Sequence, residues 1–491
     1  MKKIIISKLF LYRHRFIIGY LLLGLAFIAL LFSLPLFAQH GLSEAEMESA
    51  TKAYALDINT PLAGDLVDLP YLLLQKLSIV IFGLTPYAIK LPSVIIGLLL
   101  GLLLILLLNR WFKNNVSLLA SCLVVLSTPF LFLAGSGTPL IMIVFWPTLL
   151  LWLGSKIHGE NKPKPIYTFF FAITLLLSVF TPYMVYFAIF CVMFVVSQPH
   201  LRFIVKSLPK ILLILVGIII IAGFAVLVTN IINQPNTIME LLFAKDFNGN
   251  NFLPNIWSGF TPVFLWRGQT ESVFLAPLMS LPMLALALIG LFSTTKGFFA
   301  SRNSIASLLL IFTVIITGFN PNAVVFFILP SAILVAHGLR YLLEKWYGLF
   351  PENPYARISA LLPLTILFAI MLIPSLSQYI YGYRYNPVVA NEFYYDLAII
   401  RKNLTNETLL VGKHYDFYKI LEDSTDITVI DNVSEYPAGK IAVLYNTLPE
   451  NENYTLDQII TSPMKEKSGI IYLYTVKGEQ HGSNDGPNEA N

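Results

Sequence analysis

Charge is scarce in this chain of 491 residues: Asp, Glu, Lys and Arg make up 12% of it, whereas hydrophobic residues make up 56% and the mean hydropathy is +0.72. Soluble globular domains carry about 25% charged residues. Most of the chain therefore cannot be a water-soluble globule. The sequence predicts an all-α polytopic membrane protein.

Cysteine is almost absent too. Cys122 and Cys191 are the only two, and both lie in apolar runs, which excludes a disulfide scaffold, a thiolate zinc site and an iron–sulfur cluster. The sequence also lacks a P-loop, an HExxH motif, a nucleophile elbow and a dinucleotide fingerprint. No cofactor is implied, and a requirement for a divalent metal stays open.

Long apolar runs are what the sequence has instead. A helix needs about 20 apolar residues to cross a bilayer, and we count about eleven such runs. They cover approximately residues 16–37, 88–109, 116–134, 138–154, 166–180, 182–196, 210–231, 273–293, 304–319, 322–341 and 358–377. The first run is longer than the apolar core of a cleavable signal peptide, so we expect it to stay in the protein as a helix.

Basic residues predict the orientation. Five of them precede the first run, which places the N-terminus in the cytoplasm of a multi-pass plasma-membrane protein. Residues 166–196 are open to two interpretations, one long kinked helix or two short ones. Lysines precede this segment and Arg202 and Lys206 follow it, so two helices put both basic flanks inside. An odd number of crossings then places the C-terminal segment outside.

Two units are expected, a transmembrane domain over 1–387 and an extracytoplasmic α/β domain over 388–491. The second holds 8 Lys and Arg against 16 Asp and Glu. We expect a helix over 391–403, then strands near 408–411, 427–430, 441–445 and 469–474, and a disordered tail from about 481. Nucleic acid is not an expected partner, because no basic stripe with interleaved aromatics lies outside the membrane flanks.

The transmembrane domain has two outer loops that are longer than a connection requires, 38–87 and 232–272. Within the first, Leu69–Gly83 is apolar but short and carries Gln75 and Lys76. This pattern favours a helix that lies at the membrane interface.

Carboxylates gather just after the first run, in the sequence His40-Gly41-Leu42-Ser43-Glu44-Ala45-Glu46-Met47-Glu48. One interpretation is a general base for an acceptor hydroxyl, supplied by Glu44 or Glu46. The other is a solvated helix start, with Ser43 as N-cap and Glu46 completing a capping box. Asp65 and Asp68 follow in the same loop. His40 has no second histidine nearby, so we do not expect it to bind a metal.

Basic residues on the outer side are few, and two of them are candidates for binding a phosphate. Lys90 begins the second apolar run, where membrane anchorage by snorkelling is the alternative. Arg267 lies in the second loop, where an ion pair with Glu271 is the alternative.

Four stretches resemble a known family. These are the acidic segment Leu42–Ala50, the progression from Leu69-Pro70 through Phe82-Gly83 to Lys90-Leu91-Pro92-Ser93, the segment Phe327–Pro330, and Pro354–Arg357. They resemble the protein O-mannosyltransferase-like family of GT-C glycosyltransferases, which includes aminoarabinose transferases. The resemblance extends over most of residues 1–380.

The resemblance implies an integral-membrane glycosyltransferase with a polyprenyl-phosphate sugar donor and an extracytoplasmic acceptor. In the family, an Asp-Glu pair of the first outer loop supplies the base. Glu46 aligns with that Glu and Ala45 with the Asp, so the Asp is missing. Lys90 stands where the family usually has Arg, and Asn322 and Ala323 stand where an Arg often precedes the Leu-Leu-Pro signature.

The resulting hypothesis gives each candidate residue a role. Glu44 or Glu46 is the base, Asp65 or Asp68 orients the acceptor, and Lys90 and Arg267 hold the lipid phosphate. Two alternatives are a transporter or flippase of lipid-linked sugars, and an inactive GT-C-like scaffold. The bilayer is an expected partner, and the sugar, the acceptor (protein, lipid or envelope glycan) and the oligomeric state are left open.

Overall fold

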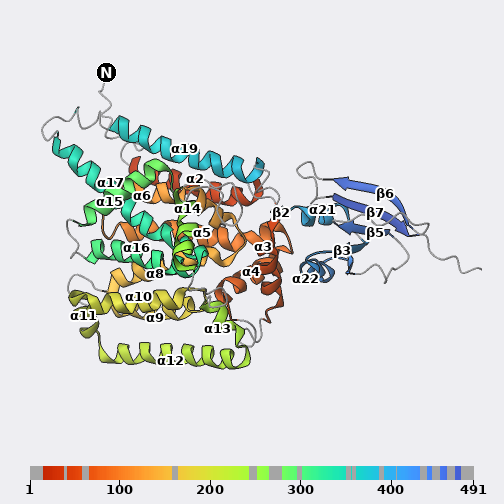
Figure 1. Cartoon of the computed structure of the whole chain (residues 1–491), viewed down its shortest axis with the longest axis horizontal. Helices are drawn as coiled ribbons and strands as arrows, with labels where there is room; N and C mark the ends of the chain where they lie inside the picture. The colour runs from red at the N-terminus through yellow and green to blue at the C-terminus, as the bar shows by residue number, and fades with distance from the viewer. Residues whose placement is uncertain are drawn as a thin grey trace, which may run out of the picture.

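The structure is a computed structural model of the chain. It describes residues 15–37, 41–57, 66–157, 164–242, 251–264, 279–295, 301–349, 355, 361–385, 392–404, 406–431, 440–444, 454–461 and 470–476. The predicted disordered tail lies outside these residues. Most of the described chain is a bundle of apolar helices, and a small sheet lies at one end of it (Figure 1).

Within the described residues, each of the expected apolar runs overlaps helix. The helices of the bundle are α2 (Arg15–Phe37), α5 (Pro86–Leu108), α6 (Asn114–Val125), α7 (Thr128–Gly135), α8 (Met142–Ile157), α9 (Pro165–Ser178), α10 (Met184–Ser197), α11 (Pro199–Lys206), α12 (Lys210–Asn233), α15 (Leu281–Thr295), α16 (Ser301–Phe319), α17 (Ile328–Leu349) and α19 (Leu361–Tyr385), with the 3-10 turns η2 (Pro139–Ile141) and η5 (Pro321–Phe327) preceding α8 and α17.

The count of spans is less regular than the sequence suggested. Among the described residues, six helical stretches have the length and apolarity to cross a membrane, or eight if two bent pairs each count as one span, and four apolar helices are shorter. One bent pair is α6 and α7, which meet at 65°. The single run expected over 116–134 is therefore two helices. The break lies at Ser127, whose backbone is extended (ψ 147°), and Pro129 lies in the first turn of α7, where a helix tolerates a missing N–H.

Hydrogen bonds identify the two ends of the bundle. At one end, the turn between α9 and α10 bonds to distant backbone, with the Asp68 N–H donating to Phe180 O (2.8 Å) and the Tyr183 N–H to Leu241 O (3.2 Å). At the other end, Arg110 donates to Ser155 O (3.0 Å), Arg302 to Trp111 O (3.1 Å) and Gln198 to Ser304 (3.2 Å). Helices α9 and α10 thus run in opposite directions, so the prediction of two helices over 166–196 is correct.

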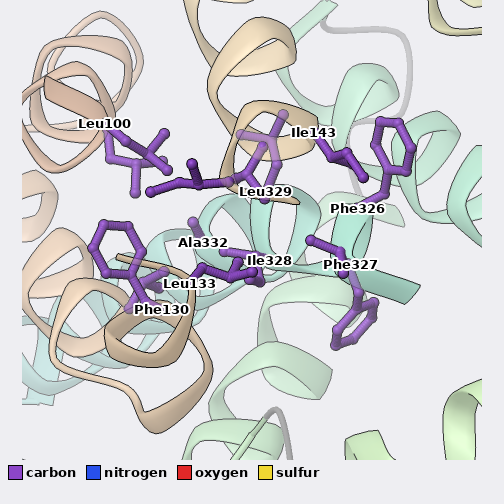
Figure 2. Packing of buried hydrophobic residues seen from close by; sticks show 14 of the residues in the cluster. Leu100, Phe130, Leu133, Ile143, Phe326, Phe327, Ile328, Leu329 and Ala332 are labelled. Atoms are coloured by element: carbon purple, nitrogen blue, oxygen red, sulfur yellow. The ribbon is translucent and has the colours of Figure 1, made fainter. Parts of the chain in front are cut away.

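Close packing fixes the bundle core. Figure 2 shows Leu100 of α5 and Phe130 of α7 near Leu329 and Ala332 of α17, all in one buried cluster. Helices α15 and α17 approach so closely at Gly290 and Gly338 that a Cβ at either position would collide with the backbone of the other helix. Small residues at such crossings allow contact between helix backbones.

The end with Asp68 carries the remaining helices and the sheet. The outer helices are α3 (Glu44–Ala55), α4 (Leu69–Phe82), α13 (Asn236–Leu241) and α14 (Phe252–Phe264). The C-terminal elements are β2 (Phe393–Tyr394), α21 (Asp396–Asn403), β3 (Thr408–Val411), α22 (Tyr415–Lys419), η6 (Ile420–Asp423), β4 (Thr428–Ile430), β5 (Lys440–Leu444), β6 (Tyr454–Thr461) and β7 (Ile470–Val476).

The sheet has the order β4-β3-β5-β7-β6, with β4, β3 and β5 parallel and the last two strands antiparallel. All four expected strands are present. Strand β6 escaped prediction because its residues are mostly exposed and its sequence, YTLDQIIT, has no sustained apolar run. The helix expected over 391–403 is wrong in its first part, because Phe393 and Tyr394 form β2, which pairs with β1 (Leu42–Ser43).

Candidate functional site

The acidic segment forms the start of α3. The Glu46 N–H donates to the Ser43 hydroxyl (3.3 Å), and the Ser43 N–H donates to Oε2 of Glu46 (2.8 Å). This is the capping box that the sequence predicted. It turns the Glu46 side chain back toward the protein, whereas Glu44, two residues earlier, is exposed.

Glu46 and Lys90 form a buried ion pair. Their charged atoms are 3.6 Å apart, and both side chains are 0% exposed. Oε1 of Glu46 accepts the Gly137 N–H (2.6 Å), and Nζ of Lys90 donates to Gly41 O (2.6 Å). Removing one member of such a pair strands a buried charge and destabilises a protein by about 3–5 kcal/mol.

Lys90 lies in the first turns of α5. The Thr85 hydroxyl caps this helix by accepting the Ala88 N–H (3.1 Å), and Pro86 is its first residue. The Nζ atom of Lys90 is also 5.7 Å from the centre of the Phe393 ring. Because Lys90 is fully buried, the snorkelling interpretation is wrong for this residue: its ammonium points into the protein.

Gln75 joins the elements around the pair. It accepts a hydrogen bond from Ser49 of α3 (2.8 Å) and donates to Ile89 O (3.1 Å) and Gly137 O (2.9 Å). Its side chain is fully buried. Lys76 donates to the carbonyls of Tyr54 and Leu56 at the end of α3. The two polar residues that made Leu69–Gly83 look interfacial are thus the residues that bind α4 to α3.

Hydroxyl groups line the inner side of the site. The Tyr71 and Ser93 hydroxyls are 2.8 Å apart, and Ser93 also donates to Thr138 O (3.3 Å). The Tyr379 hydroxyl, from α19, is within electrostatic range of Glu46. It is fully buried and has no hydrogen-bond partner among the residues that the structure describes.

The C-terminal region docks onto the same segment. Leu42 pairs with Tyr394 and Ser43 with Phe393 in a short antiparallel ladder. Residues of α3, α4 and the start of α5 share a buried apolar cluster with α21, β3 and α22. Farther out, Tyr54 donates to Asp423 (2.6 Å) and Arg401 donates to Leu84 O (2.8 Å). The start of α3, from Ser43 to Glu46 (the acidic turn), therefore contacts both the helical bundle and the C-terminal region.

Glu44 lies beside this docked region. Burial, Glu44 and Asp396 together raise the pKa of Tyr394. The Tyr394 ring in turn meets His414 edge to face, with ring centres 5.2 Å apart. His414 has a left-handed backbone (φ 57°) just after β3. Glu44 thus lies near the edge of the sheet where the parallel strands end.

The predicted site residues fall into three groups. Glu46 and Lys90 are in contact, and Glu44 is on the same helical turn as Glu46. Asp68 begins α4 with a left-handed backbone (φ 57°) and lies, like Glu46, within electrostatic range of the Tyr71 hydroxyl. Asp65, Arg267, Glu271 and His40 lie outside the described residues.

Sequence reasoning missed several members of this site. Gln75 is predicted only as a polar residue of an interfacial helix, and Gly137 has no side chain that could indicate a role. Tyr71, Ser93 and Tyr379 lie in apolar runs and gave no signal of their own. Among the described residues, no group of three or more His, Cys, Asp and Glu could hold a metal ion.

Comparisons with known proteins concern the fold. Residues 70–226 match the sequence model of the dolichyl-phosphate-mannose-protein mannosyltransferase family. The apo structure of ArnT from Cupriavidus metallidurans superposes with a TM-score of 0.53 at 14% identity, over 93% of this chain and 98% of that one. The chain has the fold of ArnT, a GT-C membrane glycosyltransferase.

A second ArnT structure, bound to undecaprenyl phosphate, gives a TM-score of 0.52 at 12% identity, over 96% of this chain and 99% of that one. No curated protein matches the chain by sequence. The family resemblance and the GT-C-like fold class predicted from the sequence are both confirmed, and the count of eleven helices is not. The family match contains the stretch from Pro70 to Ser93, which carried the resemblance most specifically.

Proposed function

We propose that this GT-C protein transfers a sugar from a polyprenyl-phosphate donor to an acceptor on the extracytoplasmic face. The observation that carries the proposal is an exposed carboxylate, Glu44, on the same helical turn as the buried Glu46–Lys90 pair at one end of the bundle. The matched family is named for a dolichyl-phosphate sugar donor, and the related ArnT binds undecaprenyl phosphate.

The proposed orientation follows from the two ends of the bundle. Arg110, Arg302 and Arg340 belong to the end opposite the site. Basic residues concentrate on the cytoplasmic side of membrane proteins. We therefore assign that end, with the N-terminus, to the cytoplasm of a multi-pass plasma-membrane protein. The site and the C-terminal sheet then lie outside.

The reaction requires a base and a cation. The acceptor hydroxyl oxygen bonds to the anomeric carbon as the bond from that carbon to the phosphate oxygen breaks. The hydroxyl proton passes to a carboxylate, and the polyprenyl phosphate leaves with the electron pair. We assign the base to Glu44, the orientation of the acceptor to Asp65 or Asp68, and the leaving phosphate to Lys90 and Arg267.

Glu44 is preferred to Glu46 as the base because of their surroundings. Both carboxylate oxygens of Glu46 already accept backbone N–H groups, and the side chain has no exposed surface. A base must reach the acceptor hydroxyl within hydrogen-bond distance. Glu44 meets that requirement without rearrangement, since it is exposed beside Tyr394 and the end of β3.

Transfer assays with the full chain in lipid nanodiscs test the proposal. Radiolabelled polyprenyl-phosphate hexoses and pentoses are offered as donors, with protein, lipid and envelope-glycan fractions as acceptors. Glu44→Gln should lower the rate by about 10²–10⁴-fold, the usual contribution of a general base. Glu48→Gln is the matched control, because Glu48 is exposed on the same helix and pairs with Lys52 (3.0 Å). Full activity in a Glu44→Gln/Glu46→Gln double variant would refute the assignment.

A second candidate function is an acceptor-binding scaffold without turnover. It rests on Ala45, which stands where the family has its catalytic Asp and is exposed. Ala45→Asp separates the two. In a scaffold, restoring the Asp creates activity that the natural chain lacks, whereas in an enzyme that relies on Glu44 the natural chain is already active.

A further inference from the structure

The carboxylate of Glu46 is surrounded by donors. Oε1 accepts the N–H of Gly137, which lies in the turn between α7 and η2, and Oε2 accepts the N–H of Ser43. The ammonium of Lys90 lies 3.6 Å away. Two backbone N–H groups and a buried cation around one carboxylate are the elements of an anion-binding site.

A buried hydroxyl with no partner in the described part of the chain belongs to the same region. The Tyr379 hydroxyl is within electrostatic range of Glu46, yet it is buried without a hydrogen-bond partner among the described residues. Buried hydroxyls are nearly always satisfied. A carboxylate has two oxygens, and here each already accepts an N–H. A phosphate monoester has three terminal oxygens and can accept the two N–H groups and a hydroxyl together.

The geometry points to an anion-binding site that Glu46 itself occupies, and we propose that the phosphate of a polyprenyl phosphate competes with Glu46 for Lys90 and for the N–H groups of Gly137 and Ser43, with the Tyr379 hydroxyl as an additional donor. This inference rests on the proposed function and adds a step to it. Lys90 reaches the lipid phosphate only by exchanging its carboxylate partner, so Glu46 is an internal competitor of the polyprenyl phosphate that sugar transfer releases and not the base.

The exchange is local. Glu46 lies on the first turn of α3, and only its side chain must rotate to release Gly137 and Lys90. The positive end of the α3 dipole favours an anion at the vacated position. Lys90 keeps its bond to Gly41 O, which joins the site to the β1–β2 ladder. Binding of the phosphate therefore alters the contact between the acidic turn and the C-terminal sheet.

Direct binding tests the inference without any transfer reaction. The probe is undecaprenyl phosphate without a sugar, titrated against the full chain in nanodiscs and measured by ligand-dependent thermal shift. Glu46→Gln should bind the lipid about tenfold more tightly than the natural chain, because the competing charge is gone. Glu48→Gln should bind like the natural chain, and Lys90→Gln should lose binding. Inorganic phosphate, as a second probe, should show the same order of variants at higher concentrations.

A second variant guards against poor folding of Glu46→Gln, which removes the charge that neutralises buried Lys90. Glu46→Asp keeps the charge but is one methylene shorter, so it cannot reach Gly137 and Ser43 equally well. It should bind undecaprenyl phosphate about threefold more tightly than the natural chain. If Glu46→Asp and any folded Glu46→Gln bind no more tightly than the natural chain, Glu46 does not compete and the inference is wrong.

The same variants separate this inference from the proposed function. Loss of transfer in Glu46→Gln together with unchanged lipid affinity identifies Glu46 as the base, which overturns the inference and leaves the transferase intact. Tighter binding by Glu46→Gln in a chain that transfers no sugar supports the inference and removes the proposed activity.

Discussion

Gly41→Ala tests whether the β1–β2 ladder positions the acidic turn. Gly41 precedes β1, and a Cβ at this position would lie 2.9 Å from Cβ of Phe393, 2.9 Å from the carbonyl oxygen of Tyr394 and 3.2 Å from the Tyr395 ring. Two of these three contacts are shorter than real Cβ atoms show. Neither belongs to the free end of a flexible side chain, so the ladder itself must move apart.

The size of the effect follows from those contacts. Forcing an extra methyl into a packed site costs about 1–3 kcal/mol, which shifts the equilibrium of the ladder by about 5- to 150-fold toward the open form. Displacement of Gly41 also moves the carbonyl that Lys90 binds and the residues that precede Glu44. A misplacement of about 1 Å reduces a catalytic rate by about 10²-fold. We therefore expect transfer to fall by about 10- to 100-fold.

Two measurements check this prediction. Initial rates of sugar transfer give the loss of activity, and hydrogen exchange at residues 42–43 and 393–394 reports whether the ladder opens. Gly382→Ala is the control, because a Cβ at Gly382 meets only Cγ of Gln378 at 3.9 Å. Transfer within twofold of the natural chain, with unchanged protection of the ladder, would show that the ladder does not position the turn.

Three further predictions concern the framework of the site. Gly338→Ala should lower the free energy of unfolding of the detergent-solubilised protein by about 3 kcal/mol relative to Gly348→Ala in the same helix, because only Gly338 meets the backbone of α15. Equal free energies of unfolding would contradict the close packing of α15 and α17. Gln75→Leu should destabilise the chain by about 3 kcal/mol, because it removes the hydrogen bonds that Gln75 makes to buried partners in α3, α5 and the 136–138 turn. The control Gln198→Leu removes one hydrogen bond to Ser304 and should cost about 1 kcal/mol. Similar losses in both variants would argue against the hydrogen-bond network around Gln75. The hydrogen bond to Asp423, with burial, raises the pKa of Tyr54. The contribution of this hydrogen bond to docking is therefore complete below pH 10, the ordinary pKa of tyrosine, and is lost as the pH rises through the raised pKa. Hydrogen exchange across α3 should show this alkaline loss in the natural chain and not in Tyr54→Phe.

Local patterns in the sequence predicted local structure well. Long apolar runs became helices because a bilayer satisfies only apolar side chains and internally bonded backbone. The spacing of Ser43 and Glu46 predicted the capping box, which involves neighbours in sequence. Four strands of the C-terminal sheet were visible as short apolar runs between turns. The resemblance around Lys90 led to the right fold.

Features made by distant segments escaped prediction. The inward direction of Lys90 depends on the docking of α3 against α5, and the same residue at a bare membrane boundary would snorkel. Gly137 contributes a backbone N–H, which no side-chain pattern reveals. The β1–β2 ladder joins Ser43 to Phe393, and two-residue strands carry no periodicity. The bend between α6 and α7 was hidden because both helices lie in one continuous apolar run.

The β1–β2 ladder also determines when the site can exist. Residues 42–43 leave the ribosome about 350 residues before their partners at 393–394, a delay of roughly 20–70 s at ordinary rates of synthesis. Every helix from α3 to α19 is made within that interval. The start of α3 is therefore made long before the strand with which it pairs, and the newly made protein gains a complete site only once residues 393–394 have been made.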